Sequence, residues 1–167
     1  MTRGSIRGLM PQNPSNLTCI ASGIAYNTSR VYAVLDTSVL VAGLRSKRGA
    51  SFQILRAIRT EDIRIAVSVA LVLEYESVLF RPGLVPGFSR QELARILDGL
   101  CLLADHQQVF FAWRPFLPDP DDDLVLELAI AASASFVITH NTGDFRGSDS
   151  MGVRTITPAS ALDLIRP

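Results

Sequence analysis

From Val31 to the C-terminus, the sequence alternates short apolar runs with longer segments of helical periodicity, and this alternation constrains the fold more than any other feature. The runs "VYAVLD", "IRIAVS", "SFVIT" and "VRTIT" are typical of strands in a buried sheet. Segments with helical spacing separate or follow them, at 37–44, 51–60, 69–80, 89–104, 121–134 and 158–165. Strands that alternate with helices predict one α/β domain, in which helices flank a mostly parallel central sheet in three layers.

Length and composition agree with a single folded domain. The chain has 167 residues, of which 48% are hydrophobic, enough for one substantial core. Residues 1–30 contain Gly, Pro, Asn and Ser without a sustained period, so we interpret them as a partly disordered extension before a domain at 31–167. The formal net charge is zero, which excludes a protein drawn to nucleic acid by its overall charge but leaves a local site open.

The cysteines and the apolar runs bear on the cellular setting. Cys19 and Cys101 are the only two cysteines, and they form neither a disulfide framework nor a metal-ligand spacing. This usage suits a reducing compartment, so we expect a cytoplasmic protein. No apolar run reaches the ~20 residues needed to span a bilayer, so no membrane partner is expected.

The stretch "FLPDPDDDLVLELAIAA" (116–132) places Asp119, Asp121, Asp122 and Asp123 directly before an apolar segment. One of Asp121, Asp122 and Asp123 is expected to cap the helix, and its neighbours gain from the helix dipole. Capping does not account for four like charges, which repel one another unless they lie in open solvent or around a cation.

Other acidic residues are predicted near the same edge of the sheet. Asp36 ends the first strand, Asn141 and Asp144 follow the "SFVIT" strand, and Glu74 lies in the apolar helix "LVLEYESVL". Taken singly, they have ordinary readings as a helix cap, turn residues and a solvent-facing carboxylate. Together they recur where ligands bind in open α/β sheets, beyond the carboxyl ends of the strands. Carboxylates gathered there favour Mg²⁺ or Mn²⁺, which would also attract a phosphate group.

Residues 31–167 resemble the PIN-domain ribonucleases, and specifically the VapC-like toxins of toxin–antitoxin pairs. The opening "VLDTSVLVAGL" is similar to the family's first strand, with Asp36 at its first metal-binding aspartate and Ser38 beside it. "LVLEYESVLFRP" resembles the second motif, with Glu74 at its glutamate. "DPDDDLVLELAIAASASFVITHN" resembles the third block, which places the third aspartate at Asp123 with Asp122 beside it.

The resemblance implies Mg²⁺- or Mn²⁺-dependent hydrolysis of RNA phosphodiester bonds. It assigns direct or water-mediated metal binding to Asp36, Glu74 and Asp123, with Asp122 beside them. The fourth family position departs, since many relatives carry Asp where this chain has Asn141. Asn141 would orient water, and Asp144 would take over the missing charge.

The resemblance also implies contacts with substrate and with partner proteins. Thr37 and Ser38 would hold a scissile phosphate oxygen. Arg45, Lys47 and Arg48 are candidates for flanking phosphates, although a solvated loop explains them slightly better. A small antitoxin and a second copy of the chain are the expected protein partners, with the apolar stripe in "LARILDGLCLLA" as a possible interface or core segment.

Three other functions are alternatives to a metal-dependent ribonuclease. A haloacid-dehalogenase-type phosphatase needs a second aspartate two residues after the first, where this chain has Ser38. A receiver domain needs an acidic pair, a phosphorylatable aspartate and a lysine in an order that the sequence lacks. The stronger alternative is a degenerate PIN-like domain that binds protein or RNA without catalysis, with Asn141 as the first sign of the loss.

Overall fold

The computed structural model describes residues 31–110 and 116–166; the predicted extension at 1–30 lies outside this part of the chain. Its five strands form one sheet in the order β3-β2-β1-β4-β5, and every neighbouring pair is parallel. The strands are β1 (Val31–Leu35), β2 (Ile63–Val67), β3 (Asp105–His106), β4 (Phe136–Ile138) and β5 (Arg154–Ile156). The helices are α1 (Thr37–Arg45), α2 (Ala50–Arg59), α3 (Val69–Leu79), α4 (Arg90–Leu103), α5 (Pro120–Ala131) and α6 (Pro158–Ile165), with a 3₁₀ turn η1 (Ser148–Met151).

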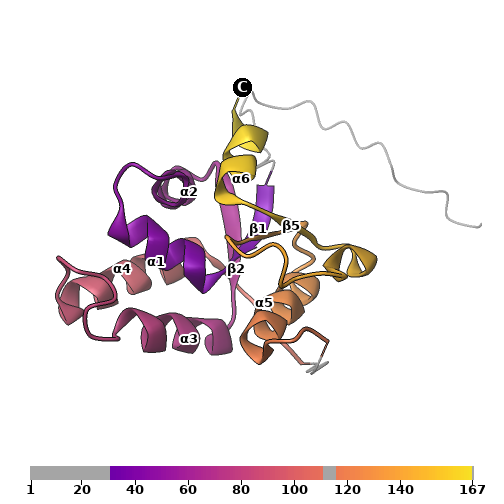
Figure 1. Cartoon of the computed structure of the whole chain (residues 1–167), viewed down its shortest axis with the longest axis horizontal. Helices are drawn as coiled ribbons and strands as arrows, with labels where there is room; N and C mark the ends of the chain where they lie inside the picture. Colours follow the sequence, from indigo (N-terminus) through magenta and orange to yellow (C-terminus); the bar gives the residue numbers. More distant parts are fainter. Residues whose placement is uncertain (1–30, 111–115, 167) are drawn as a thin grey trace, which may run out of the picture.

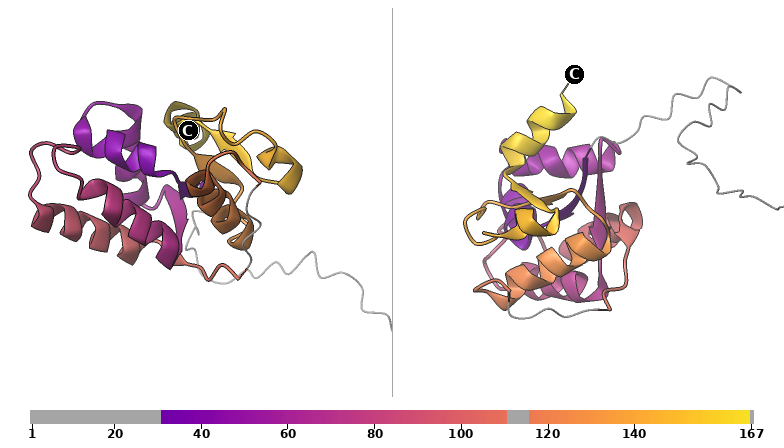
Figure 2. Two further views of the ribbon diagram at one scale, coloured as in Figure 1. Left: turned by 60° about the horizontal axis from the view of Figure 1, so that its bottom comes forward. Right: turned by 90° about the vertical axis from the view of Figure 1, so that its right-hand side faces the viewer.

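The strand order places the helices in two layers. The chain moves from β1 to β2 and β3 in one direction and then crosses back over to β4. Because parallel crossovers are right-handed, helices α1 to α4 lie on one face and α5 on the other. Figures 1 and 2 show this separation, with the sheet between α5 and the larger helical layer. The predicted three-layer α/β/α domain is confirmed.

The core lies on both faces of the sheet. Strands β1 and β2 are almost wholly buried, and Tyr75, Phe145, Leu128 and Ile54 are among the largest fully buried side chains. Tyr75 of α3 donates a hydrogen bond from its hydroxyl to the backbone carbonyl of Leu35 at the end of β1. Burial raises the pKa of the Tyr75 phenol well above its usual value, so the group stays uncharged and fastens α3 to β1.

Local signals account for most element boundaries. Ser89 and Glu92 form the predicted capping box at the start of α4. Thr157 caps α6, and Pro158 occupies its first turn. Strand β3 could not be predicted, because a strand of two residues is too short to show a period. None of the helices in the described residues is long and apolar enough to cross a membrane.

Strands β1 and β4 lie side by side at the point where the order of the sheet reverses. Open α/β sheets bind ligands in the crevice outside the carboxyl ends of the strands at such a point. The residues that follow these two strands are Asp36 and Thr139.

Candidate active site

Asp36 stands at the carboxyl end of β1 and is held by the neighbouring strand and by its own helix. Its backbone N–H donates to the carbonyl of Ile138 at 3.0 Å. Its Oδ2 accepts hydrogen bonds from the hydroxyls of Ser38 and Thr139, both at 2.5 Å, and its Oδ1 accepts a longer bond of 3.4 Å from the Ser38 N–H. The side chain therefore caps α1, as one reading of the sequence predicted, and is also fixed within the crevice.

Thr139 is a site residue that sequence reasoning missed. Its side chain is fully buried, and its Oγ1 donates to Asp36 while accepting the N–H of Asn141 at 2.9 Å. One hydroxyl thus orients a carboxylate on β1 and fixes the first turn of the loop after β4. A threonine that ends an apolar strand resembles any other strand residue, so only its position at the switch point could have identified it.

Glu74 projects from α3 toward α1. The Thr37 hydroxyl donates to Glu74 Oε1 at 2.5 Å, whereas Oε2 is buried and has no hydrogen-bond partner in the part of the chain described. Burial raises the pKa of the Glu74 carboxyl, and the charges of Asp121, Asp36 and Asp119 raise it further. The Thr37 bond opposes this shift because it favours the ionised form.

Asp122 lies among other carboxylates at the start of α5. The pKa of Asp122 is raised to about 6, first by burial and then by the charges of Asp36, Asp119, Asp144 and Asp121. An open pocket with a volume of about 480 Å³ is lined by Pro118, Asp119, Pro120, Asp122 and Asp144. We call the residues that share this mutual repulsion the acidic cluster: Asp36, Glu74, Asp119, Asp121, Asp122 and Asp144.

The structure gives Asp123 a different position from the one expected. Its carboxylate is 2% exposed and accepts the backbone N–H groups of Phe116 at 3.1 Å and Leu117 at 2.8 Å. Asp123 therefore holds the loop that leads into α5, and the geometry does not fit its predicted role as third metal ligand. Asp122, which was predicted to lie beside Asp123 in the site, is the residue whose carboxyl group lies among the other carboxylates of the acidic cluster.

Asn141 and Asp144 both lie in the exposed turn after β4, where the N–H of Asp144 donates to the carbonyl of Asn141 at 3.0 Å. Asp144 reaches the acidic cluster, since its charge contributes to the raised pKa of Asp122. The start of α5 is capped by Asp119, whose side chain accepts the N–H of Asp121 at 3.0 Å. The expectation that Asp121, Asp122 or Asp123 would be the cap is therefore wrong, because α5 begins at Pro120 and the cap position falls on Asp119.

A sequence model described as "PIN domain" matches residues 32–143, about two thirds of the chain. The chain belongs to the PIN domain family. In fold, this PIN domain is similar to a chain in the crystal structure of VapBC2 from Rickettsia felis bound to a DNA fragment from their promoter. The two are 14% identical, the TM-score is 0.53, and the match covers 75% of this chain and 98% of the other. No curated protein matches the chain.

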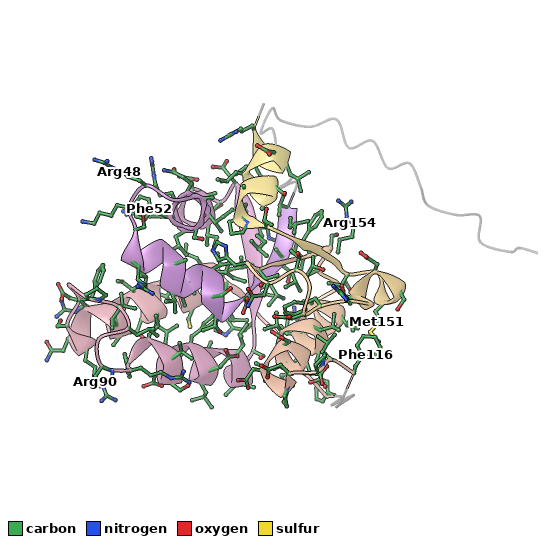
Figure 3. All side chains as sticks on the ribbon, in the orientation of Figure 1. Arg48, Phe52, Arg90, Phe116, Met151 and Arg154 are labelled. Carbon is green, nitrogen blue, oxygen red and sulfur yellow. The ribbon has the colours of Figure 1, made fainter. Side chains whose placement is uncertain are left out.

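The predicted substrate residues of the PIN domain divide into two groups. Thr37 and Ser38 lie in the crevice, but their hydroxyls are engaged by Glu74 and Asp36. Arg45 is exposed in the last turn of α1, roughly 13 Å along the helix axis from Asp36. Arg48 projects outward from the following loop at the periphery of the molecule (Figure 3). The structure therefore does not bring Arg45 to the acidic cluster.

The donor chemistry of the PIN domain's acidic cluster fits a hard divalent cation. Carboxylate oxygens are the ligands that Mg²⁺ and Mn²⁺ prefer. The raised pKa of Asp122 is caused by burial and by other carboxylates, and no arginine or lysine in the described part of the chain is seen to offset the repulsion there. The Glu74 Oε2 adds a buried acceptor with no donor. However, within residues 31–110 and 116–166 no three His, Cys, Asp or Glu side chains are close enough to coordinate one ion as they stand.

Proposed function

We propose that this PIN domain is a Mg²⁺- or Mn²⁺-dependent endoribonuclease that acts as the toxin of a toxin–antitoxin pair. The observation that carries the proposal is the buried Glu74 Oε2, which has no donor among the described residues and lies inside a group of carboxylates that no described lysine or arginine neutralises. An unpaired buried carboxylate oxygen is costly, and a cation that binds it removes that cost.

Asp36, Glu74 and Asp122 are the residues that would hold the cation, with Asp144 at the rim. A bound divalent ion lowers the pKa of a coordinated water and offsets negative charge that develops on phosphate oxygens. The chain's own groups supply the orientation: Thr139 and Ser38 fix Asp36, and Thr37 fixes Glu74. Such outer contacts typically change metal affinity or activity 10- to 100-fold, so these hydroxyls belong to the proposed machinery.

A neutral protein needs some source of attraction for a polyanion. The formal net charge is zero, and the described cations do not neutralise the acidic cluster. A bound divalent ion would reverse the local potential at the crevice and so draw in a phosphodiester without a basic surface. This arrangement supports phosphodiester hydrolysis as the reaction, and the resemblance to the PIN-domain ribonucleases supports RNA as the substrate.

The toxin role rests on the family and on the fold. The similar chain of known structure belongs to VapBC2, which was solved with a DNA fragment from its promoter. By analogy, we propose that an antitoxin protein covers the crevice of this chain and that the chain forms a homodimer. A reducing cytoplasmic setting remains our expectation for such a system.

Calorimetric titration with Mn²⁺ tests the proposal directly. The wild-type protein should bind Mn²⁺, Asp36→Asn and Asp122→Asn should lose most of the affinity, and Asp123→Asn should retain it if it stays folded. The same four proteins should then be incubated with total RNA and Mg²⁺. Absence of both Mn²⁺ binding and RNA cleavage in the folded wild type would refute the assignment.

A second candidate function is a PIN-like binding module without catalysis. It is favoured by Asn141, which brings no charge where many relatives carry an aspartate, and by the lack of three groups in coordinating distance within the described residues. The titration separates the two candidates, because a binding module would be indifferent both to Mn²⁺ and to removal of the Asp36 charge.

A further inference from the structure

An apolar groove lies at the same edge of the sheet as the acidic cluster. It measures about 600 Å³, within the range of pockets that hold small ligands. It is formed where the N-terminal half of α3 and the first half of α5 meet the segment that follows β3. We call it the α3–α5 groove and define it by Val69, Leu73, Gln107, Gln108, Phe110 and Leu124.

The groove is continuous with the acidic cluster along two helices. Leu73 directly precedes Glu74 on α3, and Leu124 lies one turn after Asp121 on α5. The charge of Asp121 contributes to the raised pKa of Glu74, so these two parts of α3 and α5 are close in space. A flexible polymer bound at the carboxylates could therefore extend from the acidic cluster into the neighbouring groove.

The surface of the groove is unusually apolar for a site in contact with water. Val69 is 78% exposed, Leu73 is 59% exposed and Phe110 is 80% exposed. Exposed apolar side chains that gather in one place mark binding surfaces more often than isolated ones do. The segment beside them is anchored, because the N–H of Gln107 donates to the carbonyl of Val67 at 2.8 Å.

We propose that the α3–α5 groove binds an unpaired nucleobase of the RNA, next to the phosphate held at the acidic cluster. This inference rests on the proposed nuclease function and adds a base-recognition subsite to it. Phe110 offers an aromatic face for stacking, which is how proteins hold bases of single-stranded RNA. Val69 and Leu73 form apolar walls, and the amides of Gln107 and Gln108 can donate and accept hydrogen bonds at a base edge.

The lining favours a base over a phosphate. Glu127 is the charged side chain among the described lining residues, which include no lysine and no arginine. Within the part of the chain that the structure describes, the groove therefore offers no cation to the backbone of the nucleic acid, whereas an apolar wall, an aromatic ring and neutral amides suit a heterocycle. The predicted subsite therefore binds the base, and the phosphate is bound at the acidic cluster.

Fluorescence polarisation with a labelled single-stranded RNA dodecamer tests the subsite without requiring cleavage. The wild-type chain with Mn²⁺ is the scaffold, so that the proposed cation is present; the dodecamer has a hydrolysis-resistant backbone, and the same dodecamer with abasic positions is the comparison probe. Adding Phe110→Ala should weaken binding of the intact probe roughly five- to hundredfold, the range that base–aromatic stacking supplies. Phe110→Trp keeps an aromatic face and should bind as the scaffold does.

Two controls show whether the effect belongs to the groove. Leu102 is 86% exposed on α4, outside the groove, so Leu102→Ala should leave RNA affinity within about twofold. Leu73→Ala, in the groove, should weaken binding in the same direction as Phe110→Ala. Light scattering on each variant records its oligomeric state, and circular dichroism records its fold.

Equal affinity of the scaffold for intact and abasic probes would overturn the proposal, as would an unchanged affinity in Phe110→Ala. A dimer that dissociates in Phe110→Ala while the affinity per monomer is constant would also overturn it, because a second copy of the chain would then fill the groove. If the wild type cleaves no RNA but base-dependent binding persists, the nuclease assignment fails while the subsite stands.

Discussion

The Thr37 hydroxyl donates to Glu74 Oε1 at 2.5 Å and so connects the first turn of α1 to the middle of α3. This bond crosses the crevice just beside Asp36. It leaves the second oxygen of Glu74 buried and without a donor in the described chain. Thr37 therefore orients Glu74, with its second oxygen left available for a cation.

Replacing Thr37 by valine tests this relationship, because valine keeps the shape and removes the donor. We expect RNA cleavage to fall roughly 10- to 100-fold, as for other residues that orient a metal ligand. The free energy of unfolding should change by only about 1 kcal/mol, the net value of one hydrogen bond. Steady-state kinetics and urea unfolding measure the two quantities. Thr60→Val, which removes a hydroxyl that donates to Asp62 Oδ2 at 2.5 Å at the end of α2, is the matched control and should retain wild-type rates.

Asp36→Asn should abolish RNA cleavage while leaving the fold intact. Asparagine can still accept hydrogen bonds from Thr139 and Ser38, so the change removes charge with little effect on shape. We expect a loss larger than about 100-fold, beyond the range seen for outer contacts. A gel assay for RNA cleavage and a circular dichroism spectrum are the measurements. Cleavage at the wild-type rate in this variant would remove Asp36 from the mechanism.

Alanine at the adjacent positions Asp122 and Asp123 should act in opposite directions on the stability of the metal-free protein. Asp123→Ala deprives two backbone N–H groups of their acceptor, so the free energy of unfolding should fall by about 2 kcal/mol or more. Asp122→Ala removes one repelling charge and should leave stability at pH 7 unchanged or higher. Urea titrations of the two variants in EDTA provide the comparison, and the reverse order would contradict these placements.

Stability of the metal-free protein should depend on pH through Asp122. Its pKa of about 6 in the folded chain lies above the ordinary value of 3.8, so the folded state binds more protons between these two pH values. Stability contributed by this group is therefore present at low pH and falls as the pH rises through about 6. Melting temperatures from below pH 4 to pH 7, which span the ordinary and the raised pKa, measure the effect. Asp122→Asn should flatten the curve, and excess Mg²⁺ should do the same to the wild type; parallel curves for all three would refute the interpretation.

Much of the fold could be predicted from the sequence because its signals are local. The apolar runs marked four of the five strands, and the capping residues Ser89 and Thr157 marked helix starts correctly. The parallel sheet followed from the alternation itself, and the sheet edge followed from the general position of ligand sites. Only β3, with two residues, left no pattern.

The details of the site depend on geometry that spacing does not supply. Neighbouring helical residues point about 100° apart, so the choice between Asp122 and Asp123 depends on where α5 begins. That start is set by the Asp119 cap and by the loop before α5. In this loop the backbone N–H groups of Phe116 and Leu117 donate to the Asp123 carboxylate. For Arg45, by contrast, spacing alone is sufficient: the number of helical residues between Asp36 and Arg45 already places the two far apart along α1.

The hydrogen bond from Tyr75 to the Leu35 carbonyl links the neighbours of Glu74 and Asp36. Both of its partners are uncharged and buried, so neither salt nor a change in pH near neutrality weakens it. Electrostatic repulsion between the carboxylates therefore cannot be relieved by separating α3 from β1. The resting protein keeps a standing negative potential at the crevice, and no slow rearrangement of the backbone is needed before a cation arrives. Because no three of the described side chains are within coordinating distance as they stand, rotation of carboxylate side chains on this fixed frame should complete the site when an ion binds.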